Sequence, residues 1–364
     1  MPTGDEEAVR RNEQLVAQLE STGSLRDPAV AGAFRAVLRH RFLPGRPLDE
    51  VYDDSAIMTK VGNRGVPLSS SSQPTIMAIM LQLLRPQPGN RVLEVGAGTG
   101  YNAALIAHLV GPAGLVVTVD IDPELAARAR ANLDAAGMPG VQVRAADGAT
   151  GWPAAAPYDR VIVTASTDDL APAWTEQLAP GGRLVLPLML AGPGQLCAAF
   201  VRQDGDLAAR ELCLCGFMPM RGAMRPGDPP ADDDLSRWLD QEARPVSHDV
   251  PLSDLRSGFE TWLALTARDY VRARTPTDES LAFGLRDEHG VALVVGSDGV
   301  HQVVTFGDGD TAGQRLAAAH DVWARERPSL DRLRIAAYPT GSVPDLGDVR
   351  IVPRPRFTFV VSSA

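Results

Sequence analysis

Apolar residues recur at helical spacing in the first part of the chain. Residues 8–40 carry them three or four positions apart, with a break near Gly23, and a second apolar stretch covers residues 76–84. This spacing predicts helices that each bury one face. Residues 46–72 lie between them and lack clear periodicity, ending in the run Ser69–Ser72. A polar loop is the simple interpretation of that run, because serine is a common turn former.

Short apolar runs alternate with amphipathic helices between residues 91 and 187. Because parallel strands are joined by helices that cover both faces of their sheet, such strands are apolar throughout. The pattern therefore predicts an α/β fold with a doubly wound, mainly parallel sheet. The predicted strands are 91–95, 115–119, 141–145, 160–164 and 183–187, and the helices between the first three strands are 101–110 and 123–136.

The remaining chain predicts a hairpin, a linker and a second domain. Asp204-Gly205 separates two strand-like runs and is a strong hairpin signal. Residues 221–234 are rich in Pro, Gly and Asp, which is typical of a linker. We expect residues 1–220 to form one domain and residues 235–364 a smaller α+β domain. Its elements are a helical segment over 252–273, strands over 281–286, 291–296 and 300–306, a helix over 311–325, and strands over 333–337 and 357–361.

Composition and charge narrow the classes of protein and partner. The formal net charge is −10 and neither half is a basic arm, so we expect no nucleic-acid partner. No apolar run approaches the ~20 residues that cross a membrane, and residues 1–11 are too polar for a signal peptide, which predicts a cytoplasmic protein. The three cysteines make neither a disulfide framework nor a zinc set, and we interpret them as core residues.

A glycine-rich turn follows the first predicted strand. Glu94 is followed by Gly96, Gly98 and Gly100, and Tyr101 then opens a helix. Such glycines let the backbone turn sharply and let its amides approach a ligand at a helix N-terminus. The spacing is G-x-G-x-G and not the G-x-G-x-x-G of dinucleotide sites. Taken alone, the turn is compatible with a structural role or with NAD.

Acidic residues at the next two strand ends favour S-adenosylmethionine (SAM). Asp120, with Ile121 beside it, ends the second strand, where a carboxylate can accept both ribose hydroxyls. Asp147 and Gly148 follow the third strand, where a side chain can accept from the adenine amino group. Together with Glu94, which precedes the glycines, these carboxylates lie on one edge of one sheet. The sequence therefore predicts SAM as cofactor and S-adenosylhomocysteine (SAH) as product.

Residues 8–220 also resemble a known family in order and at similar spacing. The chain looks like a protein-L-isoaspartate (D-aspartate) O-methyltransferase. This resemblance implies a Rossmann-like methyltransferase fold with N-terminal helices and a late hairpin, acting on a peptide or protein. It also implies that Ser72 lies against the substrate carboxylate. The matching segments are Arg41–Pro44, Tyr52–Asp54, Ser72–Pro74, Val92–Tyr101, Asp147–Gly148, Pro157–Thr164, Gln177–Val185 and Phe217–Met220.

The acceptor chemistry makes modest demands on the protein. A peptide carboxylate with a pKa near 4 is already ionised at pH 7, so its methylation needs no general base. The site only has to align that carboxylate, exclude water and exclude competitors. We assign this role to Ser72 and expect substrate contacts from Ser70, Ser71 and Gln73. The six histidines show neither triad nor metal spacing, and we expect no metal.

Two cations near the serine run have alternative interpretations. Lys60, the only lysine, and Arg64 are either solvated surface charges or groups that steer the substrate anion. Because the second role would place an ammonium beside the substrate, Lys60 is included among the candidate substrate contacts.

Two departures from the family bear on the substrate. Ser71 stands where the family usually has an apolar residue, and residues 221–364 extend the chain beyond its usual end. Extended relatives occur beside genes for ribosomally made, modified peptides, so methylation of an aspartate, closure to a succinimide and opening to isoaspartate is a plausible maturation role. General repair of isoaspartyl proteins, a methyltransferase for small carboxylic acids, and a non-catalytic SAM-binding module are the alternatives.

Overall fold

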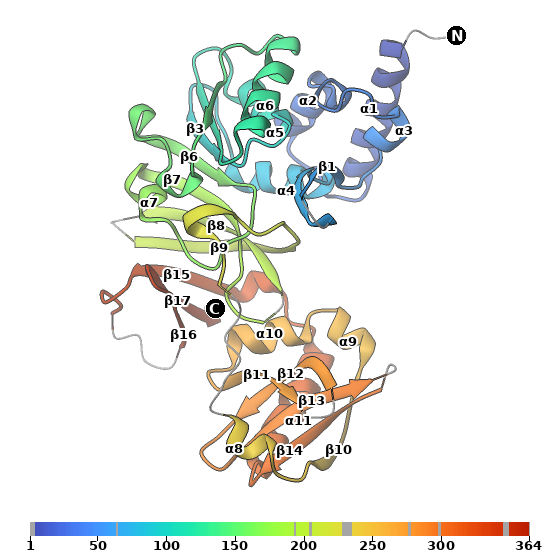
Figure 1. Ribbon diagram of the computed structural model, residues 1–364, viewed down its shortest axis with the longest axis vertical. Coiled ribbons are helices and arrows are strands. Elements are labelled where there is room, and N and C mark those ends of the chain that lie inside the picture. Colours follow the sequence, from blue (N-terminus) through green and yellow to red (C-terminus); the bar gives the residue numbers. More distant parts are fainter. Residues whose placement is uncertain are drawn as a thin grey trace. The chain divides into compact units, whose positions relative to one another are not determined.

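In the structure, a computed structural model, the chain forms two compact units. The structure describes residues 4–62, 65–192, 194–203, 206–227, 235–275, 278–297, 300–344 and 349–363. The first unit comprises Met1–Leu188 and Gln195–Pro226, and the second comprises Met189–Gly194 and Gly227–Ala364. Figure 1 shows the elements of both units in chain order. Residues 221–226 of the predicted linker therefore belong to the first unit, whereas residues 228–234 lie outside the described residues.

Helices at the N-terminus confirm the first part of the sequence prediction. Asp27 caps one of them by accepting hydrogen bonds from the amides of Ala29 and Val30, and Pro28 occupies the first helical turn. Gly23, with φ of 73°, lies in the break between the first two helices. The elements are α1 (Gly4–Ser21), α2 (Pro28–Ala36), the 3-10 helix η1 (Arg39–Phe42), α3 (Leu48–Val51) and α4 (Pro74–Leu84).

A β-hairpin occupies the region in which the sequence predicted no regular element. β1 (Ile57–Val61) pairs antiparallel with β2 (Pro67–Ser71), with Ile57 opposite Ser71. The alternative of a polar loop does not hold for Ser69–Ser71, which lie in β2. β2 buries Ser69 and Ser71 and leaves Leu68 and Ser70 more accessible, so its buried positions are occupied by hydroxyls and a hydrophobicity pattern does not detect the strand.

The sheet of the first unit confirms the predicted α/β architecture (Figure 1). Its strand order is β9-β8-β7-β6-β3-β4-β5, parallel from β5 to β7 and antiparallel from β7 to β9. The turn at Asp204-Gly205 lies outside the described residues. The strands are β3 (Arg91–Val95), β4 (Leu115–Asp120), β5 (Gln142–Ala145), β6 (Tyr158–Val163), β7 (Leu178–Leu188), β8 (Gln195–Gln203) and β9 (Asp206–Cys215).

Helices cover this sheet and share its core. α5 (Tyr101–Val110), α6 (Pro123–Ala135) and α7 (Pro172–Glu176) connect the parallel strands. One core cluster joins residues of α1, α2, α4 and α5 to side chains of the sheet such as Val92 and Ile162. The N-terminal helices are therefore an integral layer of the first unit. No helix within the described ranges is long and apolar enough to span a membrane.

The second unit is α+β, as predicted. Five antiparallel strands lie in the order β10-β14-β13-β12-β11, and β15, β17 and β16 form a second antiparallel set. The prediction of a helical segment over 252–273 was wrong at its end, because β11 begins at Tyr270. The bounds are α8 (Ser236–Leu239), β10 (Arg244–Pro251), α9 (Leu252–Arg256), α10 (Phe259–Thr266), β11 (Tyr270–Thr275), β12 (Asp278–Arg286), β13 (Gly290–Ser297), β14 (Val300–Gly307), α11 (Asp310–Glu326), β15 (Leu333–Pro339), β16 (Arg350–Pro353) and β17 (Phe357–Ser363).

Candidate active site

A cavity of about 470 Å³ opens in the first unit, at the carboxyl ends of β3 and β4. This volume lies within the range of small-molecule sites. The glycine turn and the end of β4 line one part, which we call the cofactor end. The serines of β2 and the start of α4 line another part, which we call the acceptor end. Residues 214–221, the end of β9 and the segment after it, complete the lining.

The glycine turn places its backbone directly on the cavity. Gly96 and Gly98 have φ of 105° and 53°, a region that favours glycine. A Cβ on Gly96 would lie 2.3 Å from the hydroxyl oxygen of Thr164, which donates a hydrogen bond to the Gly96 carbonyl. Gly100 has φ of 86° but does not line the cavity, since a Cβ there would meet the Ala129 carbonyl on α6. Gly96 and Gly98 thus line the cavity and Gly100 does not, whereas packing leaves little room for a side chain at Gly96 or Gly100.

Glu94 is fully buried at the inner wall of the cofactor end. Its carboxylate accepts hydrogen bonds from the Asn102 amide at 2.8 Å and the Thr118 hydroxyl at 2.5 Å. Burial raises the pKa of Glu94 to about 7, with the nearby Asp120 adding to the rise and the two hydrogen bonds opposing it. A ligand cation placed beside Glu94 would favour its ionised form. Tyr101 lines the same cavity with its ring buried.

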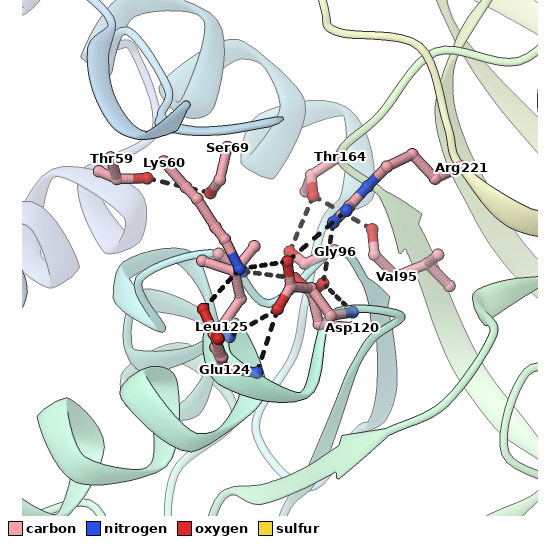
Figure 2. A network of polar contacts seen from close by, with 12 residues as sticks. Thr59, Lys60, Ser69, Val95, Gly96, Asp120, Glu124, Leu125, Thr164 and Arg221 are labelled. Carbon is pink, nitrogen blue, oxygen red and sulfur yellow. Dashed lines mark hydrogen bonds and ion pairs between the residues drawn. The ribbon is translucent and has the colours of Figure 1, made fainter. Parts of the chain in front are cut away.

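Asp120 is held rigidly at the end of β4 (Figure 2). One carboxylate oxygen accepts from the Gly98 amide and the other from the Asp122 amide, both at 3.0 Å. The side chain is 8% exposed, and its burial raises the pKa above the usual range of an aspartate. Arg221 approaches it to 3.9 Å. The carboxylate thus lies beside the glycine turn and on the cavity, where a ribose diol would be accepted.

The carboxylate of Asp147, predicted to accept from adenine, already has partners in the protein. Its two oxygens accept from the amides of Ala149 and Ala223, each at 2.9 Å, and it does not line the cavity. Its neighbour Gly148 does line the cavity, as does Ile121. The structure therefore uses the Asp147 carboxylate to fasten the segment after β9, and its role toward adenine stays a prediction.

The serine run divides by strand alternation. Ser69 and Ser71 are buried, and their hydroxyls contact the Thr59 hydroxyl at 3.0 Å and the Arg39 guanidinium at 3.4 Å. All four serines line the cavity, but within the described chain only the hydroxyls of Ser70 and Ser72 form no hydrogen bond. Their hydroxyls are therefore available to a substrate.

The segment that follows the serines is anchored by Asp54. Gln73 lines the cavity, but its side-chain amide donates to the carbonyl and the carboxylate of Asp54, both at 3.1 Å. The Thr75 amide and hydroxyl also donate to this carboxylate, at 2.8 and 2.7 Å. The predicted substrate contact of Gln73 is thus, in this structure, a contact that fixes the start of α4.

Lys60 does not lie in the predicted position of a substrate contact. Its ammonium donates to the carboxylates of Asp122 and Glu124, at 2.7 Å in each case, and Lys60 does not line the cavity. Figure 2 shows the ammonium beside Glu124. Lys60 thereby ties the β1–β2 hairpin to the start of α6. Arg64, the other cation considered, lies outside the described residues.

Arg39 is a residue that the sequence analysis missed. Its side chain is completely buried and donates to the carbonyls of Val51, Asp53, Ser55, Ser71 and Ser72 at 2.8 to 3.4 Å. Nothing in the run Arg39-His40-Arg41 distinguishes the buried arginine from Arg41, because both are arginines of the same short 3-10 helix.

Histidine and cysteine contacts also escaped prediction from spacing. In the second unit, His248 Nε2 lies 2.9 Å from His320 Nδ1, and His320 Nε2 lies 3.0 Å from Asp254. A third potential ligand, Asp321, lies near both histidines, but the ring nitrogens already satisfy each other. Cys197 lies opposite Cys213 on paired strands, as free thiols.

Comparisons with known proteins match this geometry. The family model for protein-L-isoaspartate(D-aspartate) O-methyltransferase matches residues 10–225. A protein-L-isoaspartate O-methyltransferase of Methanopyrus kandleri is 43% identical over 220 residues, which cover 60% of this chain and 95% of the relative. Protein-L-isoaspartate O-methyltransferase 1 of Rhodopseudomonas palustris is 40% identical over 213 residues, covering 58% and 83%.

A solved structure extends the comparison to the second unit. This protein-L-isoaspartate O-methyltransferase is 26% identical, with a TM-score of 0.58, and the match covers 97% of this chain and 99% of the other. The extension beyond residue 220 is thus shared with a solved structure bearing that name. Since the family model covers more than half of its length, the chain belongs to the protein-L-isoaspartate(D-aspartate) O-methyltransferase family and is a SAM-dependent carboxyl methyltransferase.

Proposed function

We propose that the chain methylates the carboxylate of an isoaspartyl residue in a peptide or protein. The observation that carries this proposal is a single cavity lined both by the glycine turn with Asp120 and by Ser70 and Ser72. The two ends are adjacent, because a Cβ on Gly98 would lie only 3.7 Å from the Ser70 carbonyl oxygen. A methyl donor at one end would therefore face an acceptor at the other.

The residues of the cofactor end fit SAM. Asp120 offers a buried, oriented carboxylate to a ribose diol, and Glu94 offers one to an amino group. Gly96 and Gly98 line the cavity, so a ligand there would meet backbone and no side chain at these two positions. When bound, SAM supplies a methyl group that is activated by a positively charged sulfur. The protein's own task at this end is to bind and orient.

The acceptor end needs to align a carboxylate and needs no proton acceptor. The substrate carboxylate is ionised near neutral pH. We assign its orientation to the hydroxyls of Ser72 and Ser70, which have no other partner in the described chain. Transfer of the methyl group from SAM to a carboxylate oxygen would give a methyl ester and SAH, with the carbon–sulfur bond broken and no proton moved. Apolar lining residues such as Met58, Leu214 and Phe217 help to exclude water.

A matched pair of peptides tests this proposal. Two peptides of identical sequence, one with isoaspartate and one with aspartate, are incubated with the full chain and SAM and followed by intact mass. We expect the isoaspartyl peptide to gain one methyl group and then lose methanol as the neighbouring backbone nitrogen closes a succinimide. Binding of SAH without methylation of either peptide would contradict the proposal and favour a non-catalytic module, whereas activity only on free acids would favour a small-molecule enzyme.

Maturation of a ribosomally made peptide is a second candidate. Ser71, which departs from the usual apolar residue, is the observation that favours it, although its hydroxyl contacts Arg39. The extension does not favour it, because a solved protein-L-isoaspartate O-methyltransferase aligns with nearly the whole chain. A precursor peptide containing aspartate, encoded by a neighbouring gene and methylated at aspartate in preference to the isoaspartyl peptide, would establish this role. Equal methylation of unrelated isoaspartyl peptides would favour general repair.

We further propose that residues 235–364 contribute to substrate recognition. Contacts to parts of a substrate remote from the carboxylate can supply binding energy that orients the reacting group. A chain that ends at Asp234 should then keep its SAH affinity and lose transfer to a protein substrate more than to a short isoaspartyl peptide. Equal rates on both substrates in the two chain lengths would rule out this role, and aggregation of the shortened chain would indicate that the extension covers apolar surface.

A further inference from the structure

Arg39 is a fully buried cation that lacks a carboxylate partner. Its side chain has no exposed surface, and it forms no ion pair with any residue that the structure describes. Buried charges in proteins are ordinarily paired, because removing an unpaired ion from water is costly. Burial lowers the pKa of the guanidinium, but an arginine stays protonated in proteins. A buried positive charge is therefore built into the first unit, and the nearby carboxylates of Asp54 and Asp53 interact with it electrostatically without forming an ion pair.

The partners of this charge are backbone carbonyls that converge from three places. Nη1 donates to the carbonyls of Val51 at 2.8 Å and Asp53 at 3.2 Å. Nη2 donates to Ser55 at 3.1 Å, Ser72 at 3.0 Å and Ser71 at 3.4 Å. The planar fork of a guanidinium suits such a set, whereas the point charge of a lysine does not. Arg39 thus joins the end of α3, the following turn and the end of β2.

The bonded carbonyls belong to peptide units at the acceptor end. The Ser71 carbonyl shares its peptide unit with the Ser72 amide, and the Ser72 carbonyl shares its unit with the Gln73 amide. A hydrogen bond from a cation to a carbonyl polarises that unit and makes its N–H a stronger donor. Ser72 and Gln73 line the cavity, whereas Arg39 does not. The guanidinium consequently acts on the acceptor end through its backbone.

The charged side chains that line the cavity show why a positive charge near its serine end matters. Among the described residues, the charged side chains of the lining are Glu94, Asp120 and Arg221. Arg221 lies 3.9 Å from Asp120 and 3.5 Å from Asp122, and the Lys60 ammonium is bound to Asp122 and Glu124. A substrate carboxylate would therefore enter a cavity that is lined by the carboxylates of Glu94 and Asp120 and has no lining cation at its serine end.

We propose that Arg39 is a positioning residue for the acceptor, which fixes the Ser71–Ser72 backbone and supplies the positive charge that favours a carboxylate there. The identity of the acceptor rests on the proposed function. The structure provides a matched control in Arg160, a half-buried arginine that donates to the carbonyls of Arg85 and Asp159 and does not line the cavity.

The test compares full-length Arg39→Lys, Arg39→Met and Arg160→Met with the unaltered chain. We expect Arg39→Met to lower kcat/KM for an isoaspartyl peptide about tenfold to a hundredfold, the range for loss of hydrogen bonds to a charged group. Arg39→Lys should recover part of this loss by keeping the charge. The Kd for SAH should change less than about twofold in all three, and Arg160→Met should keep the full rate.

A charge-specific measurement separates positioning from a merely structural role. With SAH present, the Kd of the isoaspartyl peptide is compared with that of the same peptide carrying isoasparagine, its neutral isostere. The unaltered chain should prefer the carboxylate, Arg39→Lys should keep part of the preference, and Arg39→Met should lose it. Circular dichroism and the thermal midpoint confirm that each variant is folded.

The outcomes that overturn the inference are distinct from failure of the proposed function. If the unaltered chain methylates no isoaspartyl peptide, the proposed function fails and the inference fails with it. If the chain is active but Arg39→Met keeps its kcat/KM and its preference for the carboxylate, the inference alone is overturned. Equal losses of SAH and peptide binding, or failure of both Arg39 variants to fold, would assign Arg39 a structural role and also overturn it.

Discussion

The two ends of the cavity are built in different ways. At the cofactor end, two backbone amides orient Asp120. One belongs to Asp122, two residues later, and the other to Gly98, which follows the neighbouring strand β3. At the acceptor end, the backbone of Ser72 depends on Arg39, which lies 33 residues earlier in the chain. On the proposed function, the cofactor would thus be held by residues at two adjacent strand ends, and the substrate carboxylate by a segment that a buried arginine fixes. The two ends should respond separately to substitution.

The largest expected effect is at the acceptor end, in Ser72→Ala. Loss of the hydroxyl that orients the reacting oxygen should lower methyl transfer by about ten- to a thousandfold, as for other positioned donors. The Kd for SAH should stay unchanged in calorimetry. Ser69→Ala is the matched control, because Ser69 lines the same cavity but its hydroxyl is already hydrogen-bonded to Thr59. Full activity of Ser72→Ala would transfer the orienting role to Ser70 or to backbone amides.

The next effect is at the cofactor end, in Asp120→Ala. Removal of this carboxylate should weaken SAH binding by ~1–3 kcal/mol, because it loses a charged acceptor for two hydroxyls. Titration calorimetry measures the change, with Asp134→Ala on the exposed face of α6 as control. An unaltered Kd would refute the assignment of Asp120 to the ribose.

A smaller effect is the pH dependence that Glu94 introduces. Its pKa is about 7 in the folded chain against 4.5 ordinarily, so the folded state holds more protons between these values. The contribution of Glu94 to the free energy of unfolding is therefore greatest below pH 4.5 and falls as the pH rises toward 7. If the SAM amino group binds this carboxylate, binding should release a proton, and SAH affinity should rise with pH in the same window by at most about tenfold per unit.

Calorimetry in buffers of different ionisation enthalpy detects the released proton. Glu94→Gln, which keeps the hydrogen-bonding shape and removes the titration, should abolish both dependences. Retention of the pH dependence in Glu94→Gln would show that another group is responsible.

The smallest effect is expected for Lys60→Met. The ammonium is bound to Asp122 and Glu124 near the surface, and such ion pairs contribute little. The KM for an isoaspartyl peptide should therefore change by about threefold or less, with the salt dependence of KM as a second measurement. A tenfold rise in KM that high salt removes would restore Lys60 as a group that steers the substrate.

The difference between the two ends also explains what the sequence could reveal. β3, the glycine turn and Asp120 were predicted because strand ends, positive φ and buried carboxylates follow from local chemistry. The β1–β2 hairpin was missed because buried hydroxyls, and not apolar side chains, carry its alternation.

Tertiary contacts account for the other differences at the site. The carboxylate of Asp147 follows β5 as predicted, but the amide of Ala223, which is 76 residues away, occupies one of its oxygens. Lys60 and Arg39 are both cations whose sequence neighbours do not reveal their environment. Lys60 is bound to carboxylates near the surface, whereas Arg39 is completely buried. Such pairings depend on the folded chain and leave no local pattern.

A crystal structure of the full chain with SAH and an isoaspartyl peptide would test most directly that the two ends form one reaction site. We predict the ribose hydroxyls on Asp120, and the isoaspartyl carboxylate within hydrogen-bond distance of the Ser72 hydroxyl and facing the SAH sulfur. A peptide bound away from Ser70 and Ser72, with SAH still at the glycine turn, would contradict the account.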